Sequence, residues 1–190
     1  MDLNIQKKYE IVYADPPWSF NNKKTGGSMK SGAKSKYDTM TVDEICELPI
    51  NSITSDNAIL FMWWVGSQPE EALKVVKSWG FILKTMTGFV WIKKTKNWKD
   101  WFGMGFYSRQ GSENCLIAIK GKPKRINAGI RSVIEEFEEE TIQAVSEIHS
   151  KKPNIFRERI LDLMGELPRI ELFAREKFNG WDAFGNEIEG

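Results

Sequence analysis

The sequence predicts an α/β protein in which a mostly parallel sheet is flanked by helices. Short apolar runs typical of buried strands alternate with amphipathic segments that carry helix start and stop signals, and this alternation favours parallel strands joined by right-handed crossovers. The length of 190 residues suits a single domain spanning 1–190, and a composition of 41% hydrophobic and 28% charged residues is that of a folded protein. In such sheets, ligands bind beyond the carboxyl ends of the strands.

The N-terminal half contains the clearest strand and helix patterns. Tyr9–Ala14 is a β-branched and aromatic run that ends at a proline pair, which predicts a buried strand. Thr41 and Glu44 have the spacing of a capping box, which predicts the start of a short helix. The continuous apolar run Ala58–Val65 predicts a strand covered on both faces. Residues 67–80 predict a second helix, with one apolar face and a glycine as its stop.

The C-terminal half is less regular. Its strand-like runs lie at 81–86, 87–92, 115–119 and 169–174. Residues 153–164 predict a helix with proline near its first turn. The segment 121–140 is basic and then acidic and receives no assignment, while 141–148 is a further candidate strand.

Composition excludes several kinds of site. Cys46 and Cys115 are far apart, so they form neither a disulfide framework nor a zinc cluster, and we expect both in the core. His149 is the single histidine, which excludes a His-rich metal site, and a structural role is favoured for it. No run approaches the roughly 20 apolar residues of a membrane span. With no apolar segment behind the N-terminal charges, we expect no signal peptide and a cytoplasmic location.

The net charge of +1 hides an uneven distribution. Cations gather at 23–36, 93–99 and 120–131, with few acids among them. Three such stretches around a neutral body suggest one polyanion-binding face, because phosphate contacts depend on local charge; for any one of them, a solvated loop is the alternative. The first stretch falls within residues 19–36, which are rich in Asn, Lys, Gly and Ser and predict a mobile loop.

Asp15-Pro16-Pro17-Trp18, directly after the first predicted strand, is the sharpest chemical signal. The two prolines hold the chain extended and lack N–H groups, so we expect their carbonyls to face outward without competing donors. A carboxylate and carbonyl acceptors beside an indole suit the exocyclic amino group of a flat base, which the acceptors orient while the ring stacks on the base. The alternative is a strand that ends in a turn, with Trp18 in the core.

Further motifs accompany this one in a defined order over nearly the whole chain. They are Lys36-Tyr37-Asp38-Thr39-Met40, Gly103-Met104-Gly105, Ser112-Glu113-Asn114-Cys115-Leu116, His149-Ser150-Lys151-Lys152-Pro153, Glu171-Leu172-Phe173-Ala174-Arg175, Gly180-Trp181-Asp182 and Gly185-Asn186-Glu187. Together the motifs resemble those of the MT-A70 family of S-adenosylmethionine-dependent adenine N6-methyltransferases. That family includes the catalytic subunit of the messenger-RNA adenosine methylating complex, with bacterial and phage relatives. Asn114 stands where the family usually has His.

The resemblance implies a Rossmann-like methyltransferase fold with the permuted motif order of the beta class. It also implies S-adenosyl-L-methionine as cofactor, bound by Asp15, Lys152, Phe173, Arg175, Asn186 and Glu187. In this interpretation Lys152 neutralises the methionine carboxylate, and Asp15 lies near both the cofactor ammonium and the target amine. Arg175, Asn186 and Glu187 hold the ribose and adenosine part. A solvated lysine and an ordinary turn are the alternatives for Lys152 and Asn186.

By the same resemblance, the reaction is direct transfer of a methyl group to the adenine amine in nucleic acid. Asp15, Pro16, Pro17 and Trp18 form the catalytic frame, and no covalent enzyme intermediate is needed. DNA is favoured because the short architecture resembles bacterial and phage members. An RNA methyltransferase is one alternative, and a non-catalytic nucleic-acid-binding partner subunit of the same fold is another.

Two loops near the expected pocket, 19–36 and 93–109, are candidates for holding the nucleic acid, whose target base must be unstacked. The candidate contacts are Phe20, Lys23, Lys24, Tyr37, Lys94 and Lys96. Aromatic side chains suited to stacking on an unpaired base are Trp91, Trp98, Trp101, Phe102, Phe106 and Tyr107. For these aromatics, a surface for a partner subunit is the alternative. The chain has no room for a separate target-recognition domain, which predicts loose sequence preference or specificity from short loops or a second subunit.

Overall fold

The computed structural model describes residues 6–19, 39–103, 105, 107–137 and 151–185. The strands are β1 Tyr9–Ala14, β2 Thr54–Trp64, β3 Ile82–Lys94, β4 Ser112–Lys120, β5 Val133–Phe137, β6 Arg169–Leu172 and β7 Asp182–Phe184. The helices are α1 Val42–Glu47, α2 Ile50–Ile53, α3 Pro69–Ser78 and α4 Ile155–Met164. No helix within this described part is long and apolar enough to cross a membrane.

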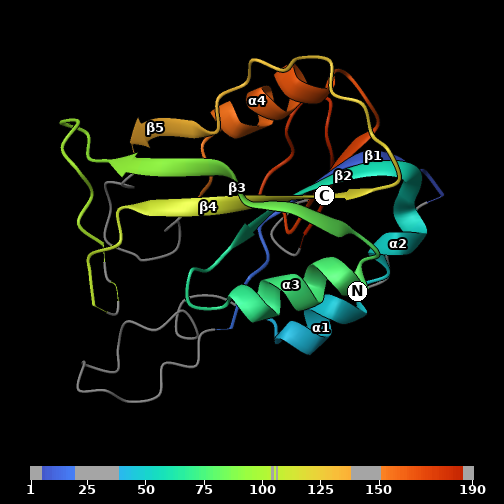
Figure 1. Cartoon of the computed structure of the whole chain (residues 1–190), viewed down its shortest axis with the longest axis horizontal. Helices are drawn as coiled ribbons and strands as arrows, with labels where there is room; N and C mark the ends of the chain where they lie inside the picture. Colours follow the sequence, from blue (N-terminus) through green and yellow to red (C-terminus); the bar gives the residue numbers. More distant parts are fainter. Residues whose placement is uncertain (1–5, 20–38, 104, 106, 138–150, 186–190) are drawn as a thin grey trace.

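The strands form one sheet in the order β5-β3-β4-β2-β1-β6-β7 (Figure 1). Strand β4 is antiparallel to both of its neighbours, β2 and β3. The other adjacent pairs are parallel. The predicted class, a mostly parallel sheet flanked by helices, is confirmed.

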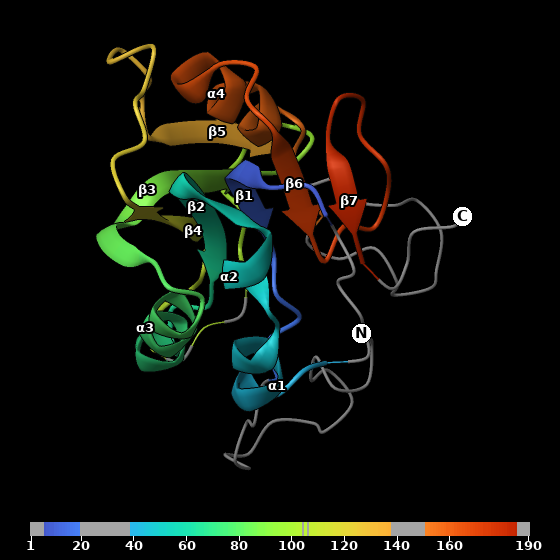
Figure 2. The same cartoon turned by 90° about the vertical axis from the view of Figure 1, so that its right-hand side faces the viewer.

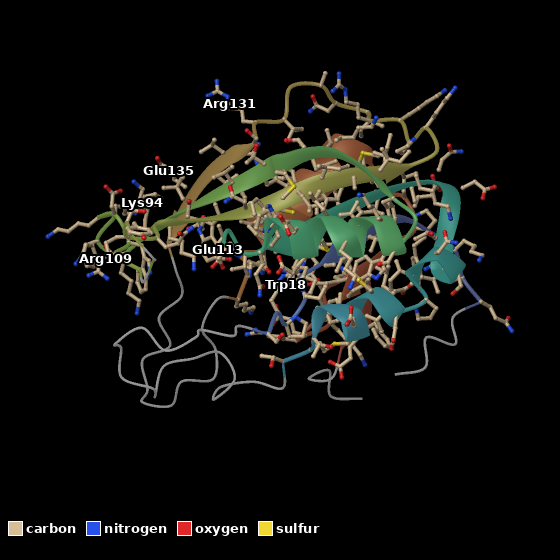
Figure 3. All side chains as sticks on the ribbon, turned by 60° about the horizontal axis from the view of Figure 1, so that its bottom comes forward. Trp18, Lys94, Arg109, Glu113, Arg131 and Glu135 are labelled. Carbon is tan, nitrogen blue, oxygen red and sulfur yellow. The ribbon has the colours of Figure 1, made fainter. Side chains whose placement is uncertain are left out.

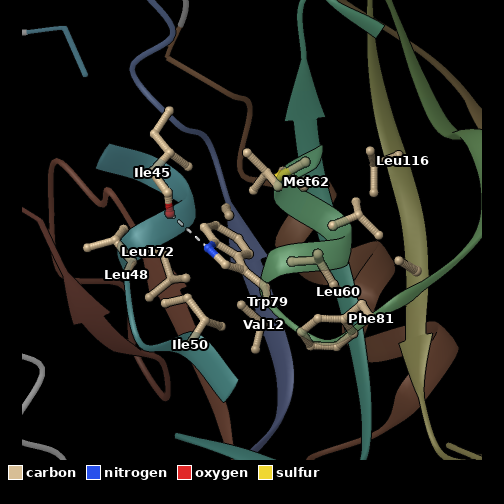
Figure 4. Packing of buried hydrophobic residues seen from close by; sticks show 14 of the residues in the cluster. Val12, Ile45, Leu48, Ile50, Leu60, Met62, Trp79, Phe81, Leu116 and Leu172 are labelled. Atoms are coloured by element: carbon tan, nitrogen blue, oxygen red, sulfur yellow. Dashed lines mark hydrogen bonds between the residues drawn. The ribbon is translucent and has the colours of Figure 1, made fainter. Parts of the chain in front are cut away.

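Helices cover both faces of the sheet, with α1, α2 and α3 on one side and α4 on the other (Figure 2). Alternate residues of β1 serve the two sides because successive strand side chains point in opposite directions. Val12 packs in the cluster that contains Trp79, whereas Tyr13 packs in the cluster that contains Phe156 of α4. Figure 4 shows the first cluster, in which the Trp79 indole donates a hydrogen bond of 2.9 Å to the Ile45 carbonyl.

The local predictions for the N-terminal half are confirmed with small shifts of boundary. Strand β1 has the predicted limits, and the capping box is present, because Thr41 Oγ1 accepts from the Glu44 amide and the Glu44 carboxylate accepts from the Thr41 amide. Strand β2 begins before the apolar run that predicts it, and α3 begins at Pro69, slightly later than expected. Gly80 lies just beyond α3 with φ of 80°.

The prediction of two separate strands at 81–86 and 87–92 is wrong, because both belong to the single strand β3. Gly88 marks a close approach within an irregular part of the β3–β4 ladder rather than a turn. A Cβ atom at Gly88 would lie 2.3 Å from Cγ1 of Ile117 on the neighbouring strand. Two short strands also lie where none was assigned, β5 within 121–140 and β7 after Trp181.

Strand direction decides which loops share an edge of the sheet. Strands β1 and β6 are parallel neighbours with Ala14 opposite Leu172, so the segments that follow them lie together, as expected. Strand β3 has the same direction, which brings the 95–111 loop to that edge. Because β4 runs the opposite way, the basic stretch that begins at Lys120 starts from the far edge. The expectation that the three basic stretches surround one binding face is wrong for this stretch.

Candidate active site

A small, charged pocket lies at the carboxyl ends of β1 and β6, next to the segment that leads into α4. Its volume is about 20 Å³. The lining residues are Asp15, Lys151, Lys152, Arg157, Glu171, Phe173, Arg175 and Glu176. The structure therefore brings together four of the residues predicted to bind a cofactor, which are Asp15, Lys152, Phe173 and Arg175.

Lys152 is the centre of this cluster. Its side chain is only 8% exposed, and its Nζ atom lies 2.7 Å from Asp15 Oδ2 and 3.1 Å from Glu113 Oε2. The same ammonium group lies 5.3 Å from the centre of the Trp63 ring. Burial alone would lower the pKa of Lys152, but the two carboxylates outweigh it and raise the pKa above its usual value. The solvated alternative for this lysine is thus incorrect.

Glu113 extends the cluster into the sheet and has no predicted role at this site. It pairs with Lys93 at 2.5 Å as well as with Lys152, so Asp15, Lys152, Glu113 and Lys93 form a chain of alternating charges. Figure 3 shows Glu113 on the ribbon near the loop end of the sheet. Its signal in the sequence is an acid just before the apolar run 115–119 of β4. Such a pattern does not reveal which cation will face it.

Arg157 and Glu171 form a second, more deeply buried pair on the pocket wall. The Arg157 guanidinium donates to both Glu171 carboxylate oxygens at 2.7 Å and to Asn154 Oδ1 at 2.8 Å. Burial raises the pKa of Glu171, and the guanidinium opposes that shift. Neither residue has a predicted role, because Arg157 is one of several polar positions of a predicted helix.

The proline frame differs from its prediction. The Pro16 carbonyl accepts from the Trp18 amide at 2.8 Å, and the Pro17 carbonyl accepts from the Met40 amide at 2.9 Å. Both carbonyls therefore have intrachain donors, contrary to expectation, although a carbonyl oxygen has a second lone pair. Trp18 is buried in the core, and its indole N–H donates to the Trp63 carbonyl at 3.1 Å. This favours the core alternative for Trp18 over a ring that stacks on a base.

The comparison with known proteins identifies the family of this site. The MT-A70 family model matches residues 9–187, nearly the whole chain. The chain belongs to the MT-A70 family. Both the resemblance and the Rossmann-like methyltransferase fold are thereby confirmed, and this MT-A70 protein is a methyltransferase.

Named relatives of this MT-A70 protein include bacterial and eukaryotic enzymes. It is 36% identical to the Type II methyltransferase M.MunI of a Mycoplasma species, an alignment that covers 96% of this chain and 79% of that protein. It is 27% identical to METTL3, the N(6)-adenosine-methyltransferase catalytic subunit of Homo sapiens, over 100% of this chain and 30% of that protein. An MT-A70-like N(6)-adenosine-methyltransferase of Drosophila melanogaster is 26% identical over 100% of this chain and 28% of that protein.

Of the predicted nucleic-acid contacts of this MT-A70 protein, Lys94 and Lys96 lie in the described part of the chain. Lys94 is directed to acids within the chain, with Asp100 at 2.9 Å and Glu135 at 3.7 Å, and the hydrogen bond to Asp100 raises its pKa despite some desolvation. These pairs favour a structural role for Lys94 over phosphate binding. Lys96 is exposed. Trp91 is fully buried, and its indole donates to the Glu136 carbonyl, so its predicted stacking role is wrong.

Several predicted residues lie outside the described part of the chain. They are Phe20, Lys23, Lys24, Tyr37, Phe106, His149, Asn186 and Glu187, and the candidate strand 141–148 lies there too. Within the described ranges, no group of three or more His, Cys, Asp or Glu side chains is arranged to hold a metal ion. Cys115 is buried, which raises its pKa, and Cys46 is half-buried. A reactive thiolate at Cys115 is therefore disfavoured.

Proposed function

We propose that this MT-A70 protein is an S-adenosylmethionine-dependent methyltransferase that acts as one domain over residues 1–190 and modifies the N6 amine of adenine in DNA. The observation that carries the proposal is the meeting of Asp15 with Lys152 at the carboxyl edge of the sheet. The preference for DNA is supported by the higher identity to a type II methyltransferase than to N(6)-adenosine-methyltransferases. The unpaired thiols Cys46 and Cys115 suit a cytoplasmic location, which we include in the proposal.

RNA is the second candidate substrate. It is supported by the alignment of the whole chain to METTL3, although the chain spans less than a third of that protein's length. A non-catalytic partner subunit is the weaker alternative, because a pure scaffold needs neither the acid nor the buried lysine of this pocket.

The pocket fits the amino-acid end of the proposed cofactor because its walls alternate in charge. Lys152 would hold the carboxylate, Asp15 would face the ammonium group, and Phe173 with Arg175 would contact the adenosine part. When bound, S-adenosylmethionine supplies the electrophilic methyl group. The space of about 20 Å³ holds little more than one water molecule. Binding therefore requires Lys152 and Asp15 to exchange part of their mutual ion pair for contacts with the ligand.

The residues of the chain contribute orientation and charge rather than covalent chemistry. The Asp15 carboxylate would accept a hydrogen bond from the target amine and so orient the nitrogen lone pair for attack. Glu113 keeps Lys152 charged and positioned, so the electrostatic field at the pocket is preorganised. Once alkylated, the nitrogen becomes acidic enough to release its proton to Asp15 or to water.

The direct test is methyl transfer from labelled S-adenosylmethionine to unmethylated DNA and, in parallel, to RNA, with the nucleosides separated afterwards. Label in N6-methyladenine from DNA is the expected result, and label from RNA alone would favour the second candidate. No label on either polymer, with the cofactor still bound, would point to a missing partner subunit. Failure to bind the cofactor would contradict the proposal.

The Asp15→Ala variant tests the proposed catalytic role. We expect methyl transfer to fall at least about a hundredfold, the lower range for loss of a positioned catalytic group, while the fold persists because Asp15 lies at the pocket edge of β1. Transfer rates and thermal unfolding followed by circular dichroism measure the two effects. The control is Asp43→Ala, which removes an exposed aspartate of α1 that pairs with Lys74 of α3. Full activity of the Asp15 variant would refute the assignment.

A further inference from the structure

The tip of the β3–β4 hairpin exposes an unusual group of aromatic side chains. Trp98, Phe102 and Tyr107 are 58%, 74% and 107% exposed. Within the described ranges, every strongly exposed aromatic side chain belongs to this loop, and the other strongly exposed large hydrophobics are aliphatic. Because aromatic side chains usually bury most of their surface, three of them exposed in one short loop indicate a surface that meets a ligand.

Backbone contacts hold the loop in an ordered form. The Trp98 amide donates to the Thr95 carbonyl at 2.8 Å, and the Thr95 amide donates to the Lys99 carbonyl at 2.8 Å. Gly103 and Gln110 form an antiparallel bridge across the loop. The two backbones are so close that a Cβ atom at Gly103 would lie 2.3 Å from the backbone carbonyl oxygen of Gln110. Trp98 itself has φ of 56°, a conformation that is costly for a bulky side chain. The exposed rings therefore belong to a loop that backbone hydrogen bonds hold in a defined conformation.

Cations accompany these rings and give the loop a positive charge. The Arg109 guanidinium lies 4.6 Å from the centre of the Phe102 ring, the geometry of a cation–π pair. Lys96 and Lys99 are also exposed, while the single acid of residues 95–111, Asp100, pairs with Lys94. Lysine is depleted at protein–protein interfaces, whereas cations interleaved with aromatic rings are typical of surfaces that bind single strands.

The position of the loop relates it to the proposed reaction. It follows β3, which is parallel to β1 in direction, so it lies at the same edge of the sheet as Asp15. In Figure 3, Arg109 and Glu113 lie toward the same end of the ribbon. A nucleic acid that places one base at the pocket can thus extend toward this loop.

We propose that the hairpin tip, defined as Lys96, Trp98, Lys99, Phe102, Tyr107 and Arg109, binds an unpaired stretch of the nucleic-acid substrate outside the catalytic pocket. Bases stack on Phe102 and Tyr107, and phosphates contact Lys99 and Arg109. This inference rests on the proposed function, because it takes nucleic acid as the substrate. It assigns the enzyme a preference for single-stranded or locally opened nucleic acid.

The test measures binding of a fluorescently labelled single-stranded DNA of about a dozen nucleotides, within the range that such surfaces cover, by anisotropy. The Phe102→Ala/Tyr107→Ala double variant should bind at least about fivefold more weakly, the equivalent of the ~1 kcal/mol lower limit for stacking of one base. The control Ile126→Ala removes a side chain that is 71% exposed but lies near the end of α4, and it should not change the affinity.

Charge is tested by Arg109→Gln against Arg125→Gln, an exposed arginine of the stretch that begins at the far edge. Loss of one phosphate contact should reduce the slope of log affinity against log salt concentration by about 0.7 for Arg109→Gln. The slope should stay unchanged for Arg125→Gln. Circular dichroism confirms that each variant is folded.

The outcomes separate this inference from the proposed function. Unchanged binding by both tip variants, or no binding of single-stranded DNA by the wild type, would overturn the inference even if the enzyme methylates DNA. Loss of self-association in sedimentation experiments without loss of DNA binding would overturn it in favour of a protein interface. Weaker DNA binding by the tip variants supports it. A wild type that binds DNA in this way yet does not bind S-adenosylmethionine would refute the proposed function alone.

Discussion

The buried lysine Lys152 organises the candidate active site at the residue scale. Lys152 holds two carboxylates that would otherwise repel each other, Asp15 directly after β1 and Glu113 in β4. Its ion pairs are worth more than surface pairs because the lysine is almost fully removed from water, although each acid keeps about a quarter of its side chain exposed.

Replacing Lys152 with methionine should therefore affect both stability and binding. We expect Lys152→Met to lower the free energy of unfolding by about 2 kcal/mol, less than the full cost of an unpaired buried charge because the acids are partly hydrated. Cofactor binding should be lost in calorimetric titration. Lys151→Met is the matched control, since Lys151 has a more exposed pair with Glu176, and its cost should stay below about 1 kcal/mol. Equal effects in the two variants would contradict the central role of Lys152.

At the scale of elements, the turn directly after β6 shapes the pocket wall. Phe173 leaves β6 with φ of 60°, and the Ala174 amide then donates to the Phe184 carbonyl at 3.1 Å. Gly185 packs directly on this turn, because a Cβ atom there would lie 2.1 Å from the Ala174 carbonyl oxygen and 2.8 Å from its nitrogen. Backbone atoms cannot move aside as a flexible side chain can, so only glycine fits at this position.

The Gly185→Ala variant should displace the segment that carries Phe173 and Arg175. We expect a loss of about 1–3 kcal/mol in the free energy of unfolding, as for other overpacked sites, together with weaker cofactor binding. Urea denaturation and calorimetry measure the two changes. Gly66→Ala serves as control, since a Cβ at Gly66 would meet nothing within 4 Å. A Gly185 variant as stable as this control would disprove the close packing.

For the whole molecule, an ionic contact links the start of the chain to the last described strand. The Asp182 carboxylate accepts from Lys7 at 2.7 Å and from the Tyr9 hydroxyl at 2.8 Å. The hydrogen bond from Lys7, together with that from Tyr9, outweighs desolvation and lowers the pKa of Asp182. A carboxyl group with a lowered folded-state pKa adds stability above its unfolded pKa of about 3.9, and this contribution is lost as the pH falls through the folded value.

Acid unfolding should therefore depend on Asp182. Between about pH 5 and about pH 3, the wild type should lose more stability than Asp182→Asn, by at most ~1 kcal/mol because Lys7 and Asp182 are half-exposed. Urea denaturation at several pH values measures the difference. Asp56→Asn, an exposed position in β2, provides the control and should follow the wild type. Parallel acid limbs for the wild type and Asp182→Asn would exclude this contact as a source of acid sensitivity.

The sequence by itself determined the class of the protein and the order of its motifs. Strand β1, the capping box at Thr41 and the glycine stop after α3 are local features, and local periodicity or side-chain chemistry is sufficient to predict them. The resemblance to the family also assigned Asp15 and Lys152 to one site. It could do so because each motif is a contiguous set of residues that can be recognised in the sequence.

Only the tertiary structure decided which groups face one another. The partners Lys152 and Asp15 are 137 residues apart, and Glu113 joins them from a strand that runs antiparallel to its neighbours. Local pattern could not reveal that Trp18 packs in the core or that the basic stretch after β4 begins at the opposite edge. The physical reason is that burial and charge pairing depend on strand order and direction, which are set by packing across the whole sheet.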